Sequence, residues 1–379
     1  MWQIFIRFLL LGLVSFGGPA AHIGYFRRVF VEELHWLDEQ QYAATVALCQ
    51  FLPGPGSSQV GFSLGYLRGG LPGAIAAFIG FTLPSFLLMY LLARFGLVLS
   101  GQPLVAAAIE GLKLLAVVVV ADAVISMARQ YCQQRVTATI TLLTAAIVLL
   151  LPFAVVQLLV LLLAALLGRL ACRTDTASSG FSSANIRWWP LWLFGVLLLL
   201  SFSGSGIWQL CSDFYQTGAL VFGGGHVVLP LLQSRVAGNM DADLFLSGYA
   251  LAQAVPGPMF SLAAFLGAEL WQSQPLIGAL LATCAIFLPG FLLVLAFNRG
   301  WQALQQRPNI AAAIAGINAA VVGLLLSALY QPVFVSAVQQ PWQMALVVVG
   351  MLLLRLWKLH IVYLILGCIS VSILITLIK

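Results

Sequence analysis

The sequence is poor in charge. Only 7% of its 379 residues are Asp, Glu, Lys or Arg, whereas 62% are hydrophobic. Soluble globular proteins carry about 25% charged residues, so this composition excludes a soluble protein. Apolar runs recur from the first residues to the last, and they predict an all-α polytopic membrane protein. The net charge of +6 is small for this length and is expected to orient helices rather than to bind nucleic acid.

Clustered metal ligands and catalytic sets are also missing. The chain has no paired acidic motif, no histidines at metal-binding spacing and no nucleophile beside a base. We therefore predict that it is not an enzyme, and we expect no catalytic residue, metal or cofactor. The cysteines are widely separated and form no CxxC motif, which argues against a zinc site, a redox pair or a disulfide framework: Cys49, Cys132, Cys172, Cys211, Cys284 and Cys368.

Two units repeat in the same order along the chain. Four pairs of segments match at offsets of 203 to 206 residues, beginning at Trp2 and Trp208, Leu37 and Met240, Thr82 and Phe287, and Ile109 and Ile314. We assign residues 1–172 to the first repeat and residues 208–379 to the second. Residues 173–207 form a polar, Ser-rich linker followed by an extra apolar segment.

Each repeat contains six hydrophobic segments, so with the extra segment the prediction is about thirteen membrane crossings. Residues 2–18 lack a basic n-region, and we interpret them as the first membrane helix rather than a signal peptide. The predicted segments are 2–21, 39–70, 72–98, 103–128, 136–151 and 153–170, then 188–206, then 208–225, 241–270, 275–297, 309–330, 340–354 and 359–378.

Charge predicts the orientation of these segments. With thirteen crossings, twelve Lys and Arg residues fall on the side of the N-terminus, and only Arg27, Arg28, Arg94 and Lys379 fall on the other. The positive-inside rule then places the N-terminus in the cytoplasm. If the two Pro-Gly-Pro segments instead return to the side they entered from, the division is ten against six. Thirteen crossings would invert the second repeat relative to the first, and inverted repeats are typical of alternating-access transporters.

The same break interrupts a predicted helix in both repeats, in "LPGPGSSQ" and "VPGPMFS". Proline ends a helix, and the next helix begins with N–H groups that lack partners and attract anions. The alternative is a kink that only shapes the bundle. The second copy has Met259 and Phe260 in place of Gly56 and Ser57, so the first copy is expected to dominate. The predicted substrate-binding residues are Pro53, Gly54, Pro55, Gly56, Ser57, Ser58 and Gln59, with Gln253, Pro256, Gly257, Pro258 and Ser261.

A second break, "SFGGPAAH", is echoed by "VFGGGHVV". Its glycines either expose N–H groups to a bound anion or let helices pack closely. The glycines in question are Gly17, Gly18, Gly223 and Gly224. The neighbouring His22 and His226 are candidates for proton coupling, with a structural role as the alternative.

Glu110 and Lys113 are ionisable residues inside a predicted membrane segment. Such residues are functional candidates by default, so we predict that Lys113 faces an anionic substrate and that Glu110 takes up a proton. The alternative is a pair that neutralises itself one helical turn apart.

In its first half the sequence closely resembles the chromate ion transporter family of the long, two-unit type. The motifs "FGG", "WLDEQQY", "LCQFLPGPGSSQVG" and "GFTLPS" occur in the family's order and spacing. The second repeat carries "FGGGHVVLPLL", "YALAQAVPGP" and "FLPGF" and resembles the family's more divergent half. The stretch "VEELHWLDE" is more acidic than in many relatives, which puts the substrate range in question.

The resemblance implies a multi-pass protein of the bacterial inner membrane that exports chromate, is driven by the proton gradient and confers chromate resistance. The alternatives are an importer or exchanger of sulfate or another oxyanion, and a passive anion channel. The expected partners are chromate or a sulfate-like oxyanion and the lipid bilayer. A homodimer is an option that the sequence leaves open.

Overall fold

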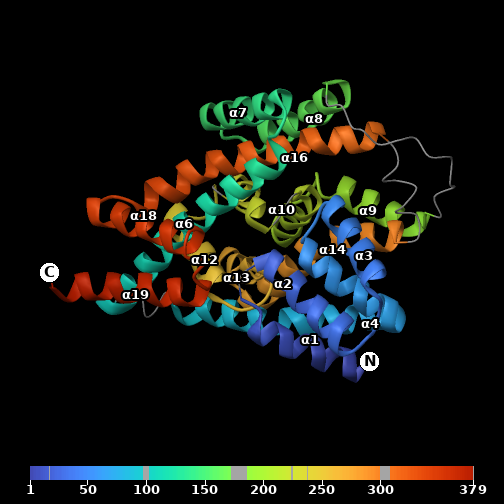
Figure 1. Ribbon diagram of the computed structural model, residues 1–379, viewed down its shortest axis with the longest axis horizontal. Coiled ribbons are helices and arrows are strands. Elements are labelled where there is room, and N and C mark those ends of the chain that lie inside the picture. The colour runs from blue at the N-terminus through green and yellow to red at the C-terminus, as the bar shows by residue number, and fades with distance from the viewer. Residues whose placement is uncertain are drawn as a thin grey trace.

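The computed structural model describes residues 1–16, 18–96, 102–171, 186–222, 225–236, 238–298 and 308–378. All regular secondary structure in these ranges is helical, which confirms the predicted all-α class (Figure 1). Within the same ranges, five helices are long and apolar enough to cross a membrane: Gly56–Phe95, Pro103–Tyr131, Pro275–Phe297, Ala311–Ala337 and Ile361–Ile378.

The longer helices follow one another in a similar order in the two repeats, and the second repeat contains additional short helices. The first comprises α1 (Trp2–Val14), α2 (Gly18–Phe26), η1 (Arg27–Glu33), α3 (Glu39–Phe51), α4 (Gly56–Leu91), η2 (Leu92–Gly96), α6 (Pro103–Tyr131), α7 (Arg135–Leu150) and α8 (Ala154–Ala171). The extra helix α9 (Trp188–Leu200) follows. The second comprises α10 (Ile207–Leu220), η3 (Gly225–Val227), α11 (Val228–Val236), α12 (Ala242–Ala254), η4 (Met259–Ser261), α13 (Leu262–Leu270), α14 (Pro275–Phe297), α16 (Pro308–Ala328), η5 (Leu329–Phe334), α17 (Val335–Ala337), α18 (Pro341–Arg355) and α19 (Ile361–Ile378).

The halves exchange their last helices. Helix α8 of the first half packs on α16 of the second, and α19 of the second packs on α6 of the first (Figure 1). Glycines at equivalent positions allow both contacts. A Cβ atom added at Gly111 would lie 2.5 Å from the carbonyl oxygen of Cys368, and one at Gly316 would collide with the carbonyl of Ala164. Close approach through small residues is how membrane helices associate, so the two halves form one packed unit.

Both broken segments of the first half fold back as helical hairpins. Phe8 and Phe26 lie on either side of the first break, yet their ring centroids are 5.6 Å apart. A continuous helix would separate them by about 27 Å. Cys49 Sγ and Ser63 Oγ flank the Pro-Gly-Pro break and lie 3.7 Å apart, although fourteen residues of straight helix span about 21 Å.

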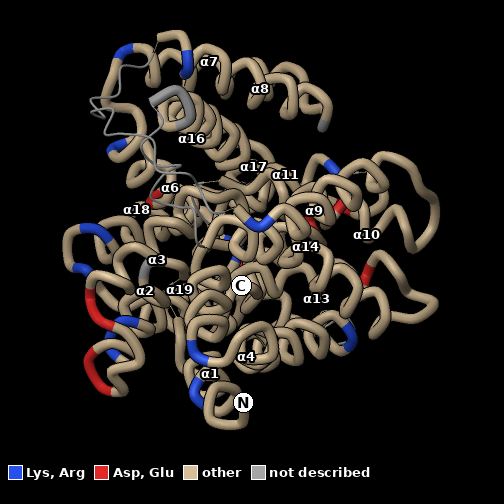
Figure 2. Tube along the Cα trace, turned by 90° about the vertical axis from the view of Figure 1, so that its right-hand side faces the viewer, with Lys and Arg blue, Asp and Glu red and all other residues tan. Residues whose placement is uncertain are grey.

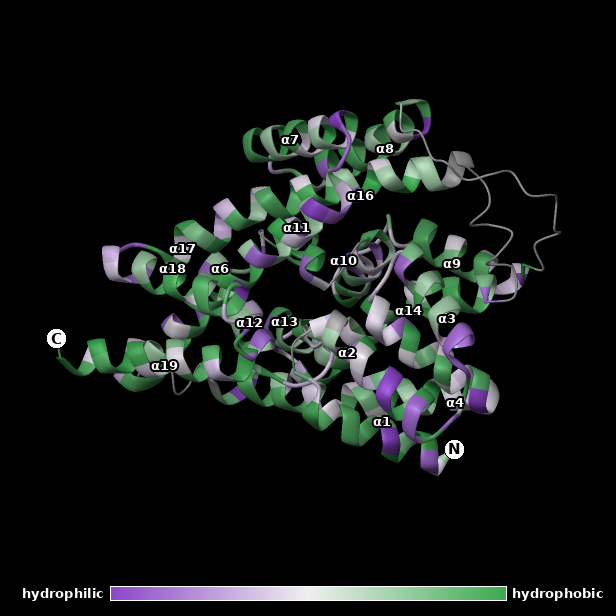
Figure 3. Ribbon diagram, viewed as in Figure 1, coloured by the Kyte–Doolittle hydropathy of each residue, from purple (hydrophilic) through white to green (hydrophobic). Residues whose placement is uncertain are grey.

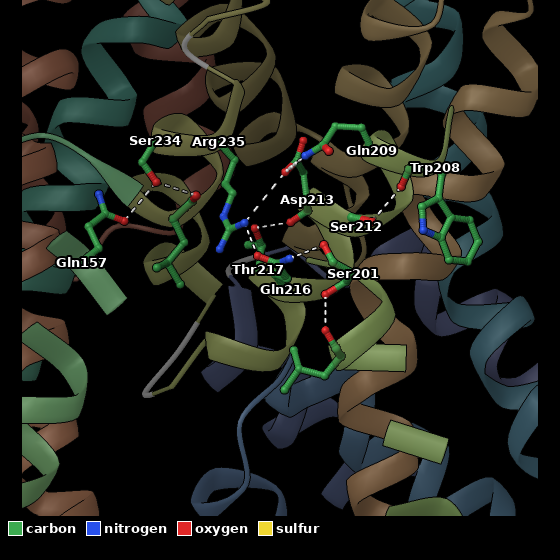
Figure 4. Close-up of polar contacts among 12 residues, drawn as sticks. Gln157, Ser201, Trp208, Gln209, Ser212, Asp213, Gln216, Thr217, Ser234 and Arg235 are labelled. Carbon is green, nitrogen blue, oxygen red and sulfur yellow. Dashed lines mark hydrogen bonds and ion pairs between the residues drawn. The ribbon is translucent and has the colours of Figure 1, made fainter. Parts of the chain in front are cut away.

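The second half folds in the same way. Across the break between α10 and α11, Arg235 Nη1 lies 3.8 Å from Asp213 Oδ1 and donates a hydrogen bond to Gln216 Oε1 (Figure 4). Gln216 in turn donates to the carbonyl oxygen of Ser201 at 2.5 Å. Across the second break, a Cβ added at Gly248 would lie 2.5 Å from the Phe265 ring. Polar contacts and aromatic packing therefore hold these hairpins closed.

A sharper turn follows each Pro-Gly-Pro hairpin. Within α4 the backbone leaves helical geometry at Gly69 and Gly70, and Gly70 has a φ of +62°. Gly65 and Gly73 then pack against each other across the turn, because neither carries a side chain that would hold the two helices apart. Residues 71–91 therefore run back along the preceding helix.

These hairpins differ from the expected course of the chain. Segments 2–21, 39–70, 208–225 and 241–270 are each predicted from the sequence to cross the membrane in one direction. The two prolines allow the break in the helix to be predicted from the sequence. The direction of the following helix depends on tertiary contacts such as Cys49–Ser63. The geometry favours the alternative in which a broken segment returns to the side it came from. The count of thirteen crossings stays a prediction that the structure does not confirm.

The outer faces suit a lipid environment. Large apolar side chains are more than half exposed on α7, α8 and α19, including Leu142, Leu162 and Leu366. Hydrophobic colouring dominates these helices (Figure 3), whereas charged residues gather near helix ends and loops (Figure 2). Soluble monomers rarely expose such continuous apolar surface, so the arrangement agrees with a membrane protein.

Candidate functional site

The four hairpin tips meet at the centre of the molecule. The N–H of Gly54, in the first Pro-Gly-Pro tip, donates to the carbonyl oxygen of Val221 at 2.7 Å. The N–H of Gly257, in the second, donates to the carbonyl oxygen of Ser15 at 2.9 Å. Ser15 and Val221 occupy equivalent positions in the two repeats, so each half's Pro-Gly-Pro tip is hydrogen-bonded to the other half.

Glycine is required at both tips. Gly54 has a φ of +129° and Gly257 a φ of +106°, which side-chain-bearing residues rarely adopt. An added Cβ would also lie 2.9 Å from Gly290 Cα at the first tip and 3.0 Å from Ser85 Oγ at the second. The prolines fix the flanking residues as extended backbone, as in Leu52 with a ψ of 145°.

The first tip opens into the start of α4, where Gly56, Ser57 and Ser58 supply the first N–H groups. We find no acceptor for these three N–H groups among the described residues. The Ser58 hydroxyl is buried and has no hydrogen-bond partner. Gln59 Nε2 donates to the carbonyl oxygens of Pro53 at 3.0 Å and Gly290 at 3.1 Å. The tip therefore presents hydrogen-bond donors that have not been used inside the protein.

The second tip carries a matching hydroxyl. Ser261 aligns with Ser58 at the offset of the Pro-Gly-Pro motifs, and its Oγ is also buried without a partner. Near it, Gln253 Nε2 lies 3.6 Å from Met259 Sδ. One unpartnered hydroxyl thus stands at the equivalent position of each half, which the sequence comparison alone did not reveal.

His22 belongs to the first tip. It is fully buried on α2, and its Nε2 lies 3.2 Å from the carbonyl oxygen of Ser15. A carbonyl only accepts, so Nε2 donates there, and Nδ1 of the neutral ring accepts from Ser57 Oγ at 3.1 Å. This contact places a candidate proton-coupling residue beside a predicted substrate-binding residue.

His226 lies beside the second tip. Its Nδ1 is 2.9 Å from the hydroxyl of the fully buried Tyr249. A cavity of about 30 Å³, enough for about one water, is lined by His226 together with Gly18, Val119, Ala252, Gln253, Val255, Gly257, Met259 and Ile361. Gly18, with a φ of +75°, begins α2, so this cavity joins parts of both halves. Gly17, Gly223 and Gly224 lie outside the described residues.

Glu110 and Lys113 lie apart from the tips. Lys113 Nζ is 2.5 Å from Asp243 Oδ1, and the Gln343 amide donates to Glu110 Oε1 at 2.5 Å. One alternative predicted that Glu110 and Lys113 pair with each other one helical turn apart, and the structure shows other partners for both. Both line a separate cavity of about 710 Å³ at the N-terminal end of α6. The sequence did not predict Asp243 as the partner of Lys113. The equivalent residue of the first repeat is Gln40, so comparison of the repeats shows no matching carboxylate.

No group of three or more His, Cys, Asp or Glu side chains that could hold a metal ion occurs within the described ranges.

The fold and the site together define a two-unit helical membrane protein with broken helices at its centre. The model of the chromate transporter family matches residues 2–169 and again residues 208–373. The chain therefore belongs to the chromate transporter family.

Relatives match over most of the chain. A chromate transport protein of Pseudomonas aeruginosa is 28% identical over 370 residues, covering 94% of this chain and 87% of the relative. A chromate transport protein of Cupriavidus metallidurans is 27% identical over 380 residues, covering 94% and 88%. An uncharacterized transporter of Methanocaldococcus jannaschii is 29% identical over 338 residues, covering 86% and 82%. No solved structure shows a significant match.

Proposed function

We propose that the chain is a secondary transporter that exports chromate across the bacterial inner membrane and confers chromate resistance. Membership of the chromate transporter family and the names of two relatives support this proposal. The observation that carries the site is the pair of buried, unpartnered hydroxyls of Ser58 and Ser261 at the hairpin tips. Such groups are costly to leave unsatisfied in a membrane protein, so a ligand that accepts hydrogen bonds is expected there.

A tetrahedral oxyanion suits these donors. Hydroxyls and the first N–H groups of α4 all donate, and the positive end of a helix dipole favours negative charge. Donors of this kind do not select strongly between tetrahedral dianions of similar size, so sulfate or another oxyanion is an alternative substrate for import or exchange.

Membrane energetics favour outward movement of a dianion. Moving one charge through the membrane potential is worth about 2.3 kcal/mol per 100 mV. A dianion that leaves a negative interior therefore gains about twice that amount, so the electrical part of the proton gradient alone drives export. Proton coupling through His22, His226 or Glu110 is part of the proposal.

The hairpins lead to a revised topology with nine crossings. If all four hairpins enter and leave on one side, the crossing helices are residues 71–91 of α4, then α6, α7, α8, α9, α14, α16, α18 and α19. Sequence order then places thirteen Lys and Arg residues on the side of the N-terminus and only Arg94, Arg235 and Lys379 on the other. The thirteen-crossing prediction divides these residues twelve against four, so the nine-crossing division is more one-sided. Arg27 and Arg28 move to the majority side, and Arg235 moves away from it. The N-terminus is cytoplasmic and the second half is inverted, since α9 adds an odd crossing.

The test uses everted membrane vesicles that take up labelled chromate. We expect Ser58→Ala and Ser261→Ala each to lower the uptake rate by about tenfold or more, because each removes a donor to the anion. Ser372→Ala is the matched control, since Ser372 on α19 also has a buried, unpartnered hydroxyl but lies outside the tips. Equal rates in all three variants would remove the tips from the transport site.

Two further measurements separate the alternatives. Inhibition of chromate uptake by unlabelled sulfate, with the direction of flux recorded, tests the sulfate alternative. Chromate flux that follows the membrane potential and is unchanged when the pH gradient alone is collapsed would identify a passive channel.

A further inference from the structure

Two large cavities lie along opposite ends of α6. The cavity of about 710 Å³ touches the N-terminal part of the helix, from Val105 to Lys113. A second cavity of about 790 Å³, here called the vestibule, touches the C-terminal part, from Val119 to Met127. Between them, residues 114–118 of α6 are fully buried. The middle of α6 therefore separates two openings in the protein.

The two cavities differ in charge. Among the described residues, three carboxylates line the N-terminal cavity, Glu110, Asp241 and Asp243, against the single cation Lys113. A dianion that entered this cavity would meet net negative charge, which opposes its entry.

The vestibule has a different balance. Its only carboxylate, within the described residues, is Asp122, whose Oδ1 accepts from Arg355 Nε at 2.7 Å. Arg28, His226 and His360 also line it. Arg28 lies at the exposed mouth, where it pairs with Glu33 at 3.0 Å. The vestibule is thus neutral to positive, and the basic residues in its lining come from three separate parts of the chain.

The vestibule also leads to the hairpin tips. It shares Val119, His226 and Ile361 with the cavity of about 30 Å³ that reaches Gln253 and Gly257. No residue of the hairpin tips lines the N-terminal cavity within the described part of the chain. His226 stands at the junction. Its Nδ1 is engaged with Tyr249, and its Nε2 has no partner among the described residues.

We propose that the vestibule is the entry route for a tetrahedral oxyanion, and that His226 is its first side-chain contact before the second Pro-Gly-Pro tip. The proposal rests on the oxyanion transport proposed above and adds the path and the residue that receives the substrate. In the nine-crossing topology the vestibule opens to the cytoplasm, because it contains Arg28 and the C-terminal end of α6. An exporter must take up its substrate from that side.

The test changes the charge of the vestibule without changing its packing. Gly24 lines the vestibule on α2, and an added Cβ there meets nothing within 4 Å. In everted vesicles we expect Gly24→Glu to raise the KM for labelled chromate about tenfold, and Gly24→Lys to lower it. Opposite effects of the two charges at one position cannot result from misfolding.

Ala106 supplies the matched control, because it is exposed and lines the N-terminal cavity. Ala106→Glu and Ala106→Lys are expected to change the KM by less than about twofold. The inference is overturned if the Ala106 pair shifts the KM with opposite signs and the Gly24 pair does not. It is also overturned if neither pair shifts it.

A variant at the junction tests the contact residue. We expect His226→Phe to raise the KM at least about fivefold and His226→Gln, which keeps a donor, to restore most of the affinity. If the unaltered chain carries no chromate at all, the proposed function fails. If it carries chromate with a KM that is insensitive to Gly24 and His226, only the entry route fails.

Discussion

At the scale of single residues, the contact between His22 and Ser57 links a titratable ring to the predicted anion site. In the neutral ring Nδ1 accepts a hydrogen bond from the Ser57 hydroxyl, so that hydroxyl is not free to donate to a substrate. A protonated ring would donate to Ser57 Oγ instead, and the hydroxyl proton would then point elsewhere. The protonation state of one buried side chain thereby changes the number of donors at the first hairpin tip.

The same contact makes a stability prediction. His22→Leu leaves the carbonyl oxygen of Ser15 and the hydroxyl of Ser57 without their partner, so we expect the free energy of unfolding in detergent to fall by about 1–3 kcal/mol. His360→Leu is the control, because His360 is exposed. An equal loss in both variants, measured by denaturant titration, would show that the buried contacts of His22 contribute nothing.

At the scale of elements, the exchange of helices between the halves depends on Gly111 and Gly316. We expect Gly111→Ala to lower the free energy of unfolding by about 1–3 kcal/mol, because the new methyl group would press on the backbone of α19 at Cys368. Gly316→Ala should act in the same way on α8.

Gly367 on α19 provides the comparison for these two variants. A Cβ there meets nothing within 4 Å. Gly367→Ala should therefore be neutral or stabilising, since alanine favours helix over glycine by about 1 kcal/mol. A destabilisation equal to that of Gly111→Ala would mean that glycine in these helices matters for flexibility rather than for packing.

The sequence predicted the helical elements and the positions of their breaks, but not how the chain reverses at each break. The repeat, the breaks at Pro53 and Pro256, and the helical class follow from local rules that a single sequence displays. The reversal of the chain at each break does not, because it depends on contacts such as Phe8 with Phe26 that join residues far apart in sequence. The partner of Lys113 could not be predicted from the sequence for the same reason, because Asp243 belongs to the other half of the chain.

At the scale of the whole molecule, the two topologies place two loops on opposite sides. With nine crossings Arg28 is cytoplasmic and Asn239 is outside, and with thirteen crossings these positions are reversed. We expect a membrane-impermeant maleimide to label Asn239→Cys in intact cells, and to label Arg28→Cys only in everted vesicles. Both residues are exposed, and the experiment requires replacement of the native cysteines.

Lys358→Cys controls for leakage of the reagent, because both topologies place it in the cytoplasm. Labelling of Arg28→Cys from outside, with Asn239→Cys protected, would restore the thirteen-crossing count and move the vestibule to the outer face.

The reciprocal hydrogen bonds at the centre have a consequence for biosynthesis. When the first half has been inserted and the second has not yet been made, the N–H of Gly54 and the carbonyl of Ser15 still await Val221 and Gly257. Each unmet group in a lipid environment costs several kcal/mol, so the first half alone is less stable than the same half in the complete chain. Completion of the second half closes both bonds together. Neither copy of the duplicated unit can therefore satisfy the hydrogen bonds of its own Pro-Gly-Pro tip without the other.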